Sequence, residues 1–136
     1  MPASSTALAY GLLRLTLGVN FLMHGLTRIL RGVSEFAEKT VGQFAETPLP
    51  APLVSAYAVG LTYVEFGVGL LILLGLFTRE ALVVGALVMI SLIFGTSLRQ
   101  DWGTVGTQMI YALFFFLLLH FLENNRYSLD HLRQRR

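Results

Sequence analysis

The stretch that decides the fold is residues 7–29, ALAYGLLRLTLGVNFLMHGLTRI. At about 1.5 Å per helical residue, roughly 20 residues cross the hydrocarbon core of a bilayer, and this run is long enough. It nevertheless contains Arg14, Asn20 and His24. An ionised side chain at membrane depth costs at least ~2.5 kcal/mol, so it is retained mainly where it has a partner or a function. We expect Arg14 to form an intramembrane ion pair with Glu65, the acidic residue inside another apolar run.

The composition indicates a helical membrane protein. The chain has 136 residues, of which 54% are hydrophobic and 13% charged, against about 25% charged in a typical soluble domain. The apolar runs are long and do not alternate with polar residues, which argues against a membrane β-barrel. We therefore predict an all-α integral membrane protein, with residues 1–136 forming a single transmembrane domain.

The polar segments divide the chain into four membrane-crossing helices. We predict these helices at residues 7–31, 53–77, 80–98 and 104–122, followed by a basic tail at 123–136. The turns after the second and third helices are short, which makes consecutive helices antiparallel and gives an up-down four-helix bundle. Residues 32–52 form a longer connection, which we expect to lie at the membrane interface as a short amphipathic helix followed by a proline-rich turn.

The positive charges give an expected orientation. An even number of crossings puts both termini on one side of the membrane. That side carries five basic residues outside the helices, Arg79, Arg126, Arg133, Arg135 and Arg136, whereas the other carries Arg28, Arg31, Lys39 and Arg99. The positive-inside rule then favours cytoplasmic termini, in a bacterial inner membrane whose anionic lipids suit the basic tail. The net charge of +2 does not suggest a nucleic-acid partner.

The side chains that carry redox chemistry in other proteins are scarce. The chain has no cysteine, which excludes thiol–disulfide exchange and cysteine-ligated clusters within it. His24 and His120 lie toward the ends of two antiparallel helices, so we expect them near opposite membrane faces and predict no metal or haem site. No Ser-His-Asp arrangement and no phosphate-binding loop is recognisable.

The first helix has two distinct faces. Gly11, Gly18, Gly25 and Gly32 recur every seven residues, which predicts a seam where another helix backbone approaches closely. On roughly the opposite face lie four polar residues, Thr16, Asn20, His24 and Thr27. That polar face is expected to meet protein or water, either in another subunit or in a ligand cavity.

Several short motifs resemble the DoxX family. They are Leu13-Arg14-Leu15, Gly18, Phe21-Leu22-Met23-His24-Gly25 and Arg28, followed by the run from Tyr63 to Arg79, YVEFGVGLLILLGLFTR. The resemblance implies a small four-helix membrane protein. It also implies a link to quinone chemistry, because some family members are subunits of quinone-linked oxidoreductases such as thiosulfate:quinone oxidoreductase. Others are membrane partners of oxidative-stress or sulfur-redox assemblies.

Two functions follow as hypotheses. In the first, the chain is a quinone-linked redox subunit with a polar pocket around Arg14, Asn20, His24 and Glu65. The Arg14–Glu65 pair then either holds the quinone headgroup and relays protons or only fixes helix register. His24 either protonates a quinone oxygen or caps backbone carbonyls.

In the second hypothesis, the chain is a non-catalytic membrane anchor or scaffold subunit of a larger complex. A small-molecule transporter is a weaker alternative, because four helices would need to oligomerise to form a path. The residues identify no electron carrier in this chain, so a redox role requires a partner protein as electron donor. Gln108, Tyr111 and His120 are further, weaker site candidates.

Overall fold

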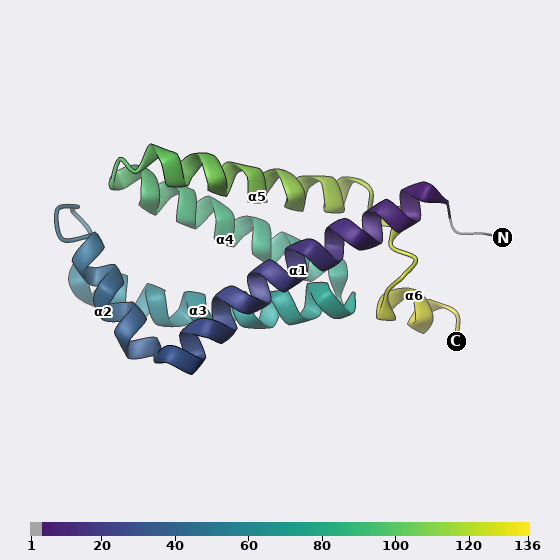
Figure 1. The fold of residues 1–136 in the computed structure, drawn as a ribbon, viewed down its shortest axis with the longest axis horizontal. Helices are drawn as coiled ribbons and strands as arrows, with labels where there is room; N and C mark the ends of the chain where they lie inside the picture. The colour runs from purple at the N-terminus through teal and green to yellow at the C-terminus, as the bar shows by residue number, and fades with distance from the viewer. Residues whose placement is uncertain (1–3) are drawn as a thin grey trace.

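The computed structural model describes residues 4–136 and is helical throughout its regular elements (Figure 1). The elements are α1 (Ser5–Arg31), α2 (Val33–Gln43), α3 (Ala51–Leu74), α4 (Thr78–Leu98), α5 (Trp102–His120), the 3₁₀ turn η1 (Leu122–Asn124) and α6 (Leu129–Gln134). Four of these helices, α1, α3, α4 and α5, are long and apolar enough to cross a membrane. The predicted fold class, a membrane helical bundle, is confirmed.

The four long helices run up and down, as the short turns predicted. Figure 1 shows the start of α1 and the whole of α6 at one end of the bundle, and α2 at the other. We call these the terminal end and the α2 end. Each helix begins two residues earlier than predicted. The last crossing, α5, also stops two residues earlier, at His120, and α3 stops three residues earlier, at Leu74. It stops there because Gly75 adopts a left-handed conformation, with φ of 67°, and such a residue ends a helix.

The seam between α1 and α3 is built on glycine, as the seven-residue spacing predicted. A Cβ atom added to Gly25 would lie 2.6 Å from the backbone nitrogen of Phe66, and one added to Gly18 would lie 2.8 Å from that of Leu73. Only glycine leaves room for backbones this close. The other two predicted seam glycines lie outside it: Gly11 faces the ring of Tyr127 at an ordinary contact distance, and Gly32 follows the end of α1 with no backbone neighbour that close.

The core fills the space between α1, α3, α4 and α5. Its fully buried side chains include Leu17, Ile72, Leu82, Met89 and Phe115. The rings of Phe21 and Phe115 meet edge to face with their centres 5.1 Å apart, which joins α1 to α5. Tyr10 adds a second link, because its hydroxyl donates to the carbonyl of Leu118 at 2.7 Å.

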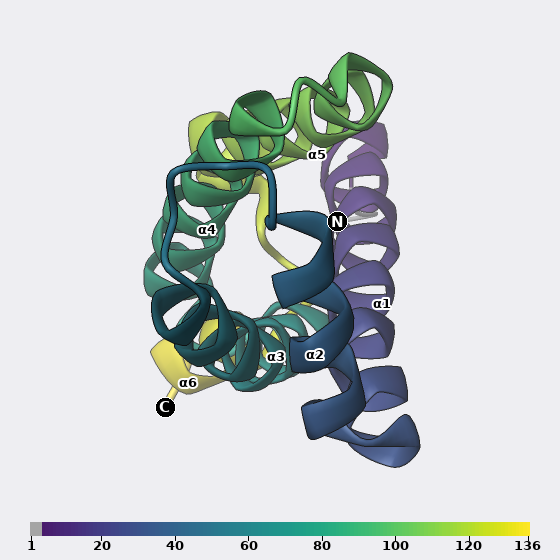
Figure 2. The same cartoon turned by 90° about the vertical axis from the view of Figure 1, so that its left-hand side faces the viewer.

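The connection between the first two crossings contains the predicted short helix. Figure 2, seen from the α2 end, shows α2 lying in front of α1 and α3. Ala37 of α2 is buried. The Arg28 guanidinium lies 4.0 Å from the centre of the Phe36 ring of α2, and that of Arg99 lies 5.4 Å from the ring of Phe44, the residue that follows α2. These contacts hold α2 against the bundle.

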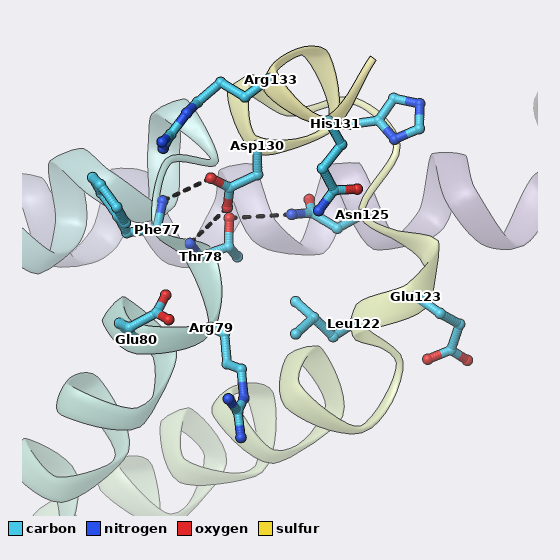
Figure 3. A pocket seen from close by; sticks show the side chains of 11 residues that line it. Phe77, Thr78, Arg79, Glu80, Leu122, Glu123, Asn125, Asp130, His131 and Arg133 are labelled. Carbon is cyan, nitrogen blue, oxygen red and sulfur yellow. Dashed lines mark hydrogen bonds between the residues drawn. The ribbon is translucent and has the colours of Figure 1, made fainter. Parts of the chain in front are cut away.

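The tail after α5 folds back on the terminal end. Asp130 of α6 accepts hydrogen bonds from the backbone amides of Phe77 and Thr78, at 2.9 and 2.8 Å, and Asn125 donates to the Thr78 hydroxyl at 3.1 Å (Figure 3). The carboxylate thus caps the N-terminus of α4, a place where a negative charge is stabilised by the helix dipole.

Candidate functional site

The α2 end of the bundle contains a largely apolar cavity. Its volume is about 350 Å³, within the range of small-molecule sites. Side chains from α2, α3, α4 and α5 form its wall, together with Arg28 from α1 and Leu49 from the connection. The apolar part of the wall is Phe36, Phe44, Leu49, Leu53, Val54, Leu61, Leu92 and Phe94.

Polar side chains meet in pairs around this apolar wall. The hydroxyl groups of Tyr57 and Ser91 lie 2.6 Å apart, and the amide of Gln108 donates to the hydroxyl of Thr96 at 3.0 Å. All four residues line the cavity. The Gln108 side-chain oxygen is buried and has no hydrogen-bond partner among residues 4–136. A buried acceptor without a donor is unfavourable, so a ligand hydroxyl or amine that reached this oxygen would be bound favourably.

The third pair is ionic and involves Glu65. The guanidinium of Arg28 donates to the Glu65 carboxylate at 2.7 Å, and Glu65 is only 4% exposed. Arg28 also lines the cavity, whereas Glu65 lies behind it. The carboxylate therefore fixes a cation at the cavity wall, and the pair keeps both charges balanced where water is scarce.

The prediction that Arg14 pairs with Glu65 is wrong, and helix register explains why. Gly18 faces Leu73 and Gly25 faces Phe66, so seven residues along α1 match seven residues back along α3. Continuing this register puts Glu65 beside residue 26, twelve residues from Arg14. Twelve helical residues span about 18 Å, too far for any arginine to bridge, whereas Arg28 is adjacent.

Arg14 is bound by backbone instead. Its guanidinium donates to the carbonyl of Leu73 at 2.9 Å and also to the carbonyls of Ile72 and Tyr127. Ile72 and Leu73 belong to the last turn of α3, where carbonyls lack the amide donor four residues on. The Ile72 carbonyl also accepts from the Gly75 amide at 3.2 Å. The buried arginine thereby caps α3 and ties it to the tail, at the opposite end of the bundle from the cavity.

The other two predicted site residues lie on the outward side of α1. His24 is exposed, and its Nδ1 donates to the carbonyl of Asn20 at 2.8 Å. Asn20 is partly exposed, with a buried side-chain oxygen that has no partner in the described chain. Neither residue lines the cavity. None of the four predicted site residues lines the α2-end cavity. Glu65 is connected to the cavity wall only through its ion pair with Arg28.

Comparison with known proteins identifies the family. The DoxX family model matches residues 9–98. The chain belongs to the DoxX family. No curated protein and no solved structure matches it. In this DoxX-family chain the matched region runs from α1 to the end of α4, so it includes most of the cavity wall. The contribution of α5, Thr104 and Gln108, lies outside the match.

Sequence patterns indicate only some of the residues that line the α2-end cavity. Tyr57 and Leu61 precede Glu65 at four-residue intervals and so share its helix face. That spacing marks one wall of the cavity. Ser91 and Gly95 stand out only as small residues, a pattern that predicts close packing, and here Gly95 borders the ring of Phe44. Gln108 is a predicted candidate, but its partner Thr96 comes from another helix and no spacing reveals it.

A second, more open cavity lies at the terminal end of this DoxX-family protein. It measures about 700 Å³ and is surrounded by charged side chains of both signs, among them Arg79, Glu80, Glu123 and Arg133 (Figure 3). Burial raises the pKa of the Asp130 carboxyl, but hydrogen bonds from Thr78 and Phe77 and the nearby charge of Arg133 outweigh it, so this pKa lies below its ordinary value. The cavity is lined by charges of both signs, which makes the α2-end cavity the better candidate for a lipophilic ligand.

Proposed function

We propose that this DoxX-family chain is a small integral membrane subunit of a quinone-linked redox system, and that the α2-end cavity binds the quinone headgroup. The observation that carries the proposal is the combination of an apolar 350 Å³ cavity with three polar pairs at one membrane end. A quinone headgroup is a flat apolar ring with two opposed oxygens. It therefore needs a cavity whose wall is mostly apolar and carries a few polar groups.

The polar groups suit both redox forms of a quinone. A quinone carbonyl accepts hydrogen bonds, and the Arg28 guanidinium is a donor at the cavity wall. The Tyr57 hydroxyl donates to Ser91, whose own proton goes to the carbonyl of Val88, so Tyr57 becomes a donor to the ligand by turning away from Ser91. A quinol hydroxyl donates, and the unpartnered oxygen of Gln108 is an acceptor. The cavity therefore offers complementary partners before and after reduction, which takes two electrons and two protons.

The electrons would come from a partner protein. Without cysteine, the chain has no ligands for an iron–sulfur cluster, and its sequence contains no recognisable flavin-binding motif. We place this subunit in a bacterial inner membrane with cytoplasmic termini, because Arg79 and the four tail arginines favour that side.

Retained quinone tests the proposal. The protein is extracted from its native membrane in mild detergent, and quinone is quantified per chain beside Gln108→Leu extracted in the same way. We expect close to one quinone per wild-type chain and much less in the variant. Equal, low amounts in both would contradict the proposal, as would a lack of quinone-dependent activity with the proteins encoded beside it.

A second role, as a non-catalytic anchor or scaffold subunit, is favoured by the outward face of α1. Thr16 and His24 are exposed there, and Asn20 is partly exposed. Polar side chains at membrane depth usually face protein. In this role a companion chain covers the face, and in-membrane crosslinking from position 24 would capture it. A protein that stays solitary and active in native membranes would contradict the anchor role.

A further inference from the structure

A lipid-sized groove lies at the terminal end, at the opposite end of the bundle from the proposed quinone cavity. It has a volume of about 680 Å³ and runs between α1, the last turn of α3 and the segment that leads into α6. Leucines from all three parts form most of its wall, including Leu12, Leu74 and Leu132. Leu12 and Leu132 are exposed, so the groove is open to whatever surrounds the protein.

The inner wall of this groove contains a cation, Arg14, that no carboxylate among residues 4–136 contacts. Arg14 lines the groove and is 2% exposed, and its hydrogen bonds go to carbonyl oxygens. Its Nε has no partner among the described residues. Asp130 is near enough to act on the Arg14 charge electrostatically. Its carboxylate, however, accepts hydrogen bonds from the amides of Phe77 and Thr78 and makes none with Arg14. A buried charge held only by dipoles favours an anion nearby.

The rim of the groove adds a second cation. Arg126 is exposed and lines the same groove, beside Tyr127. None of the described residues that line the groove is acidic, in contrast to the neighbouring cavity, where Glu80, Glu123 and Asp130 offset the basic side chains. The groove thus has an apolar body along the membrane span and a positive end at the membrane surface.

We propose that this groove binds one anionic phospholipid. An acyl chain fits along the leucines of α1 and α3, and the headgroup phosphate lies near Arg126, in the positive field of Arg14. A zwitterionic phospholipid has the same acyl chains but carries an ammonium group that the two arginines repel. The net negative charge of the headgroup is therefore what the site selects. The proposal stands independently of the quinone cavity, which shares no lining residue with this groove.

Native mass spectrometry of the full chain tests this proposal. The protein is released from nanodiscs that contain equal amounts of phosphatidylglycerol and phosphatidylcholine with identical acyl chains. We expect one phosphatidylglycerol to be retained per chain, in excess over phosphatidylcholine. A basic residue at the surface is worth about a fivefold change in binding of an anionic lipid, so Arg126→Gln should reduce this excess about fivefold.

Matched variants separate a specific site from general charge attraction. Arg79→Gln removes the same charge from the same end, outside the groove, and should leave the excess unchanged. Leu132→Glu puts a negative charge on the groove wall at an exposed position and should abolish the excess, whereas Leu132→Gln should preserve most of it. Equal losses in Arg126→Gln and Arg79→Gln would overturn the proposal, as would equal retention of the two lipids by the wild type.

Discussion

Replacing Gly25 by alanine should separate the first two crossings. The new Cβ would lie 2.6 Å from the backbone nitrogen of Phe66 and 2.7 Å from the carbonyl oxygen of Thr62. An ordinary contact begins near 3.4 Å, so α1 and α3 must move apart by about 0.8 Å. Backbone atoms of a helix cannot rotate away as a side chain does, and the whole seam has to shift.

The expected loss follows from that shift. A gap of 0.5–1 Å forfeits about a quarter to a half of each van der Waals attraction across the seam, and overpacking of this kind destabilises by about 1–3 kcal/mol. Alanine also favours the helical state by about 1 kcal/mol relative to glycine, which opposes the loss. Gly67→Ala provides the control, because a Cβ there meets nothing within 4 Å.

The assay is unfolding of both variants in mixed micelles with increasing denaturing detergent, followed by circular dichroism. Gly67→Ala should match or slightly exceed the wild type. The helix preference of alanine is common to both variants and cancels, so Gly25→Ala should fall below Gly67→Ala by the overpacking cost of about 1–3 kcal/mol. Gly18→Ala, with a slightly longer approach of 2.8 Å, should lie between them. If Gly25→Ala and Gly67→Ala unfold together, the antiparallel register described for α1 and α3 is wrong.

Three further predictions concern the polar groups. Arg28→Ala or Glu65→Ala alone should each destabilise by about 3 kcal/mol by leaving a buried charge without its partner. The double variant removes both charges and should unfold at a higher detergent concentration than either single variant. Strictly additive losses of stability would contradict the pairing. Because the pKa of Asp130 is depressed on folding, its contribution is fully present above the ordinary value of 3.8 and is lost as the pH falls from there through the lower pKa of the folded state. Asp130→Asn should therefore lower the thermal midpoint at pH 7 and much less at pH 3; an equal effect at both would argue against the helix cap. Tyr57→Phe, which loses one donor, should weaken binding of a short-chain quinone about fivefold in an equilibrium titration, and unchanged affinity would remove Tyr57 from the site.

The fold could be predicted from hydropathy because the bilayer demands it. Four apolar runs of about 20 residues have few alternatives to four helices. Of the four glycines spaced by seven, Gly18 and Gly25 lie in the α1–α3 seam as predicted. The predicted basic tail also contains a structured element, α6, whose attachment could not be foreseen. A six-residue helix has no stability of its own, and it depends here on Asp130 meeting two amides of α4.

The candidate site was harder to predict because it depends on register. Residue types showed that Arg14 and Glu65 each need a partner at membrane depth, and both have one. The partner of Arg14 is a set of backbone carbonyls at the end of α3, which composition cannot reveal. The partner of Glu65 is Arg28, a residue that sequence reasoning assigned to the membrane edge. Arg14 lies twelve residues along α1 from the position that is level with Glu65, so the two cannot pair. The glycine seam sets that register between α1 and α3.

Photoaffinity labelling tests the central claim, that the α2-end cavity holds the quinone headgroup. The purified protein in nanodiscs is irradiated with an azido-quinone, with and without excess unmodified quinone, and the labelled peptides are identified by mass spectrometry. We predict competable labelling of the peptides that contain Tyr57, Ser91 and Gln108. Competable labelling confined to the terminal end around Arg14, or labelling that excess quinone does not reduce, would contradict the assignment.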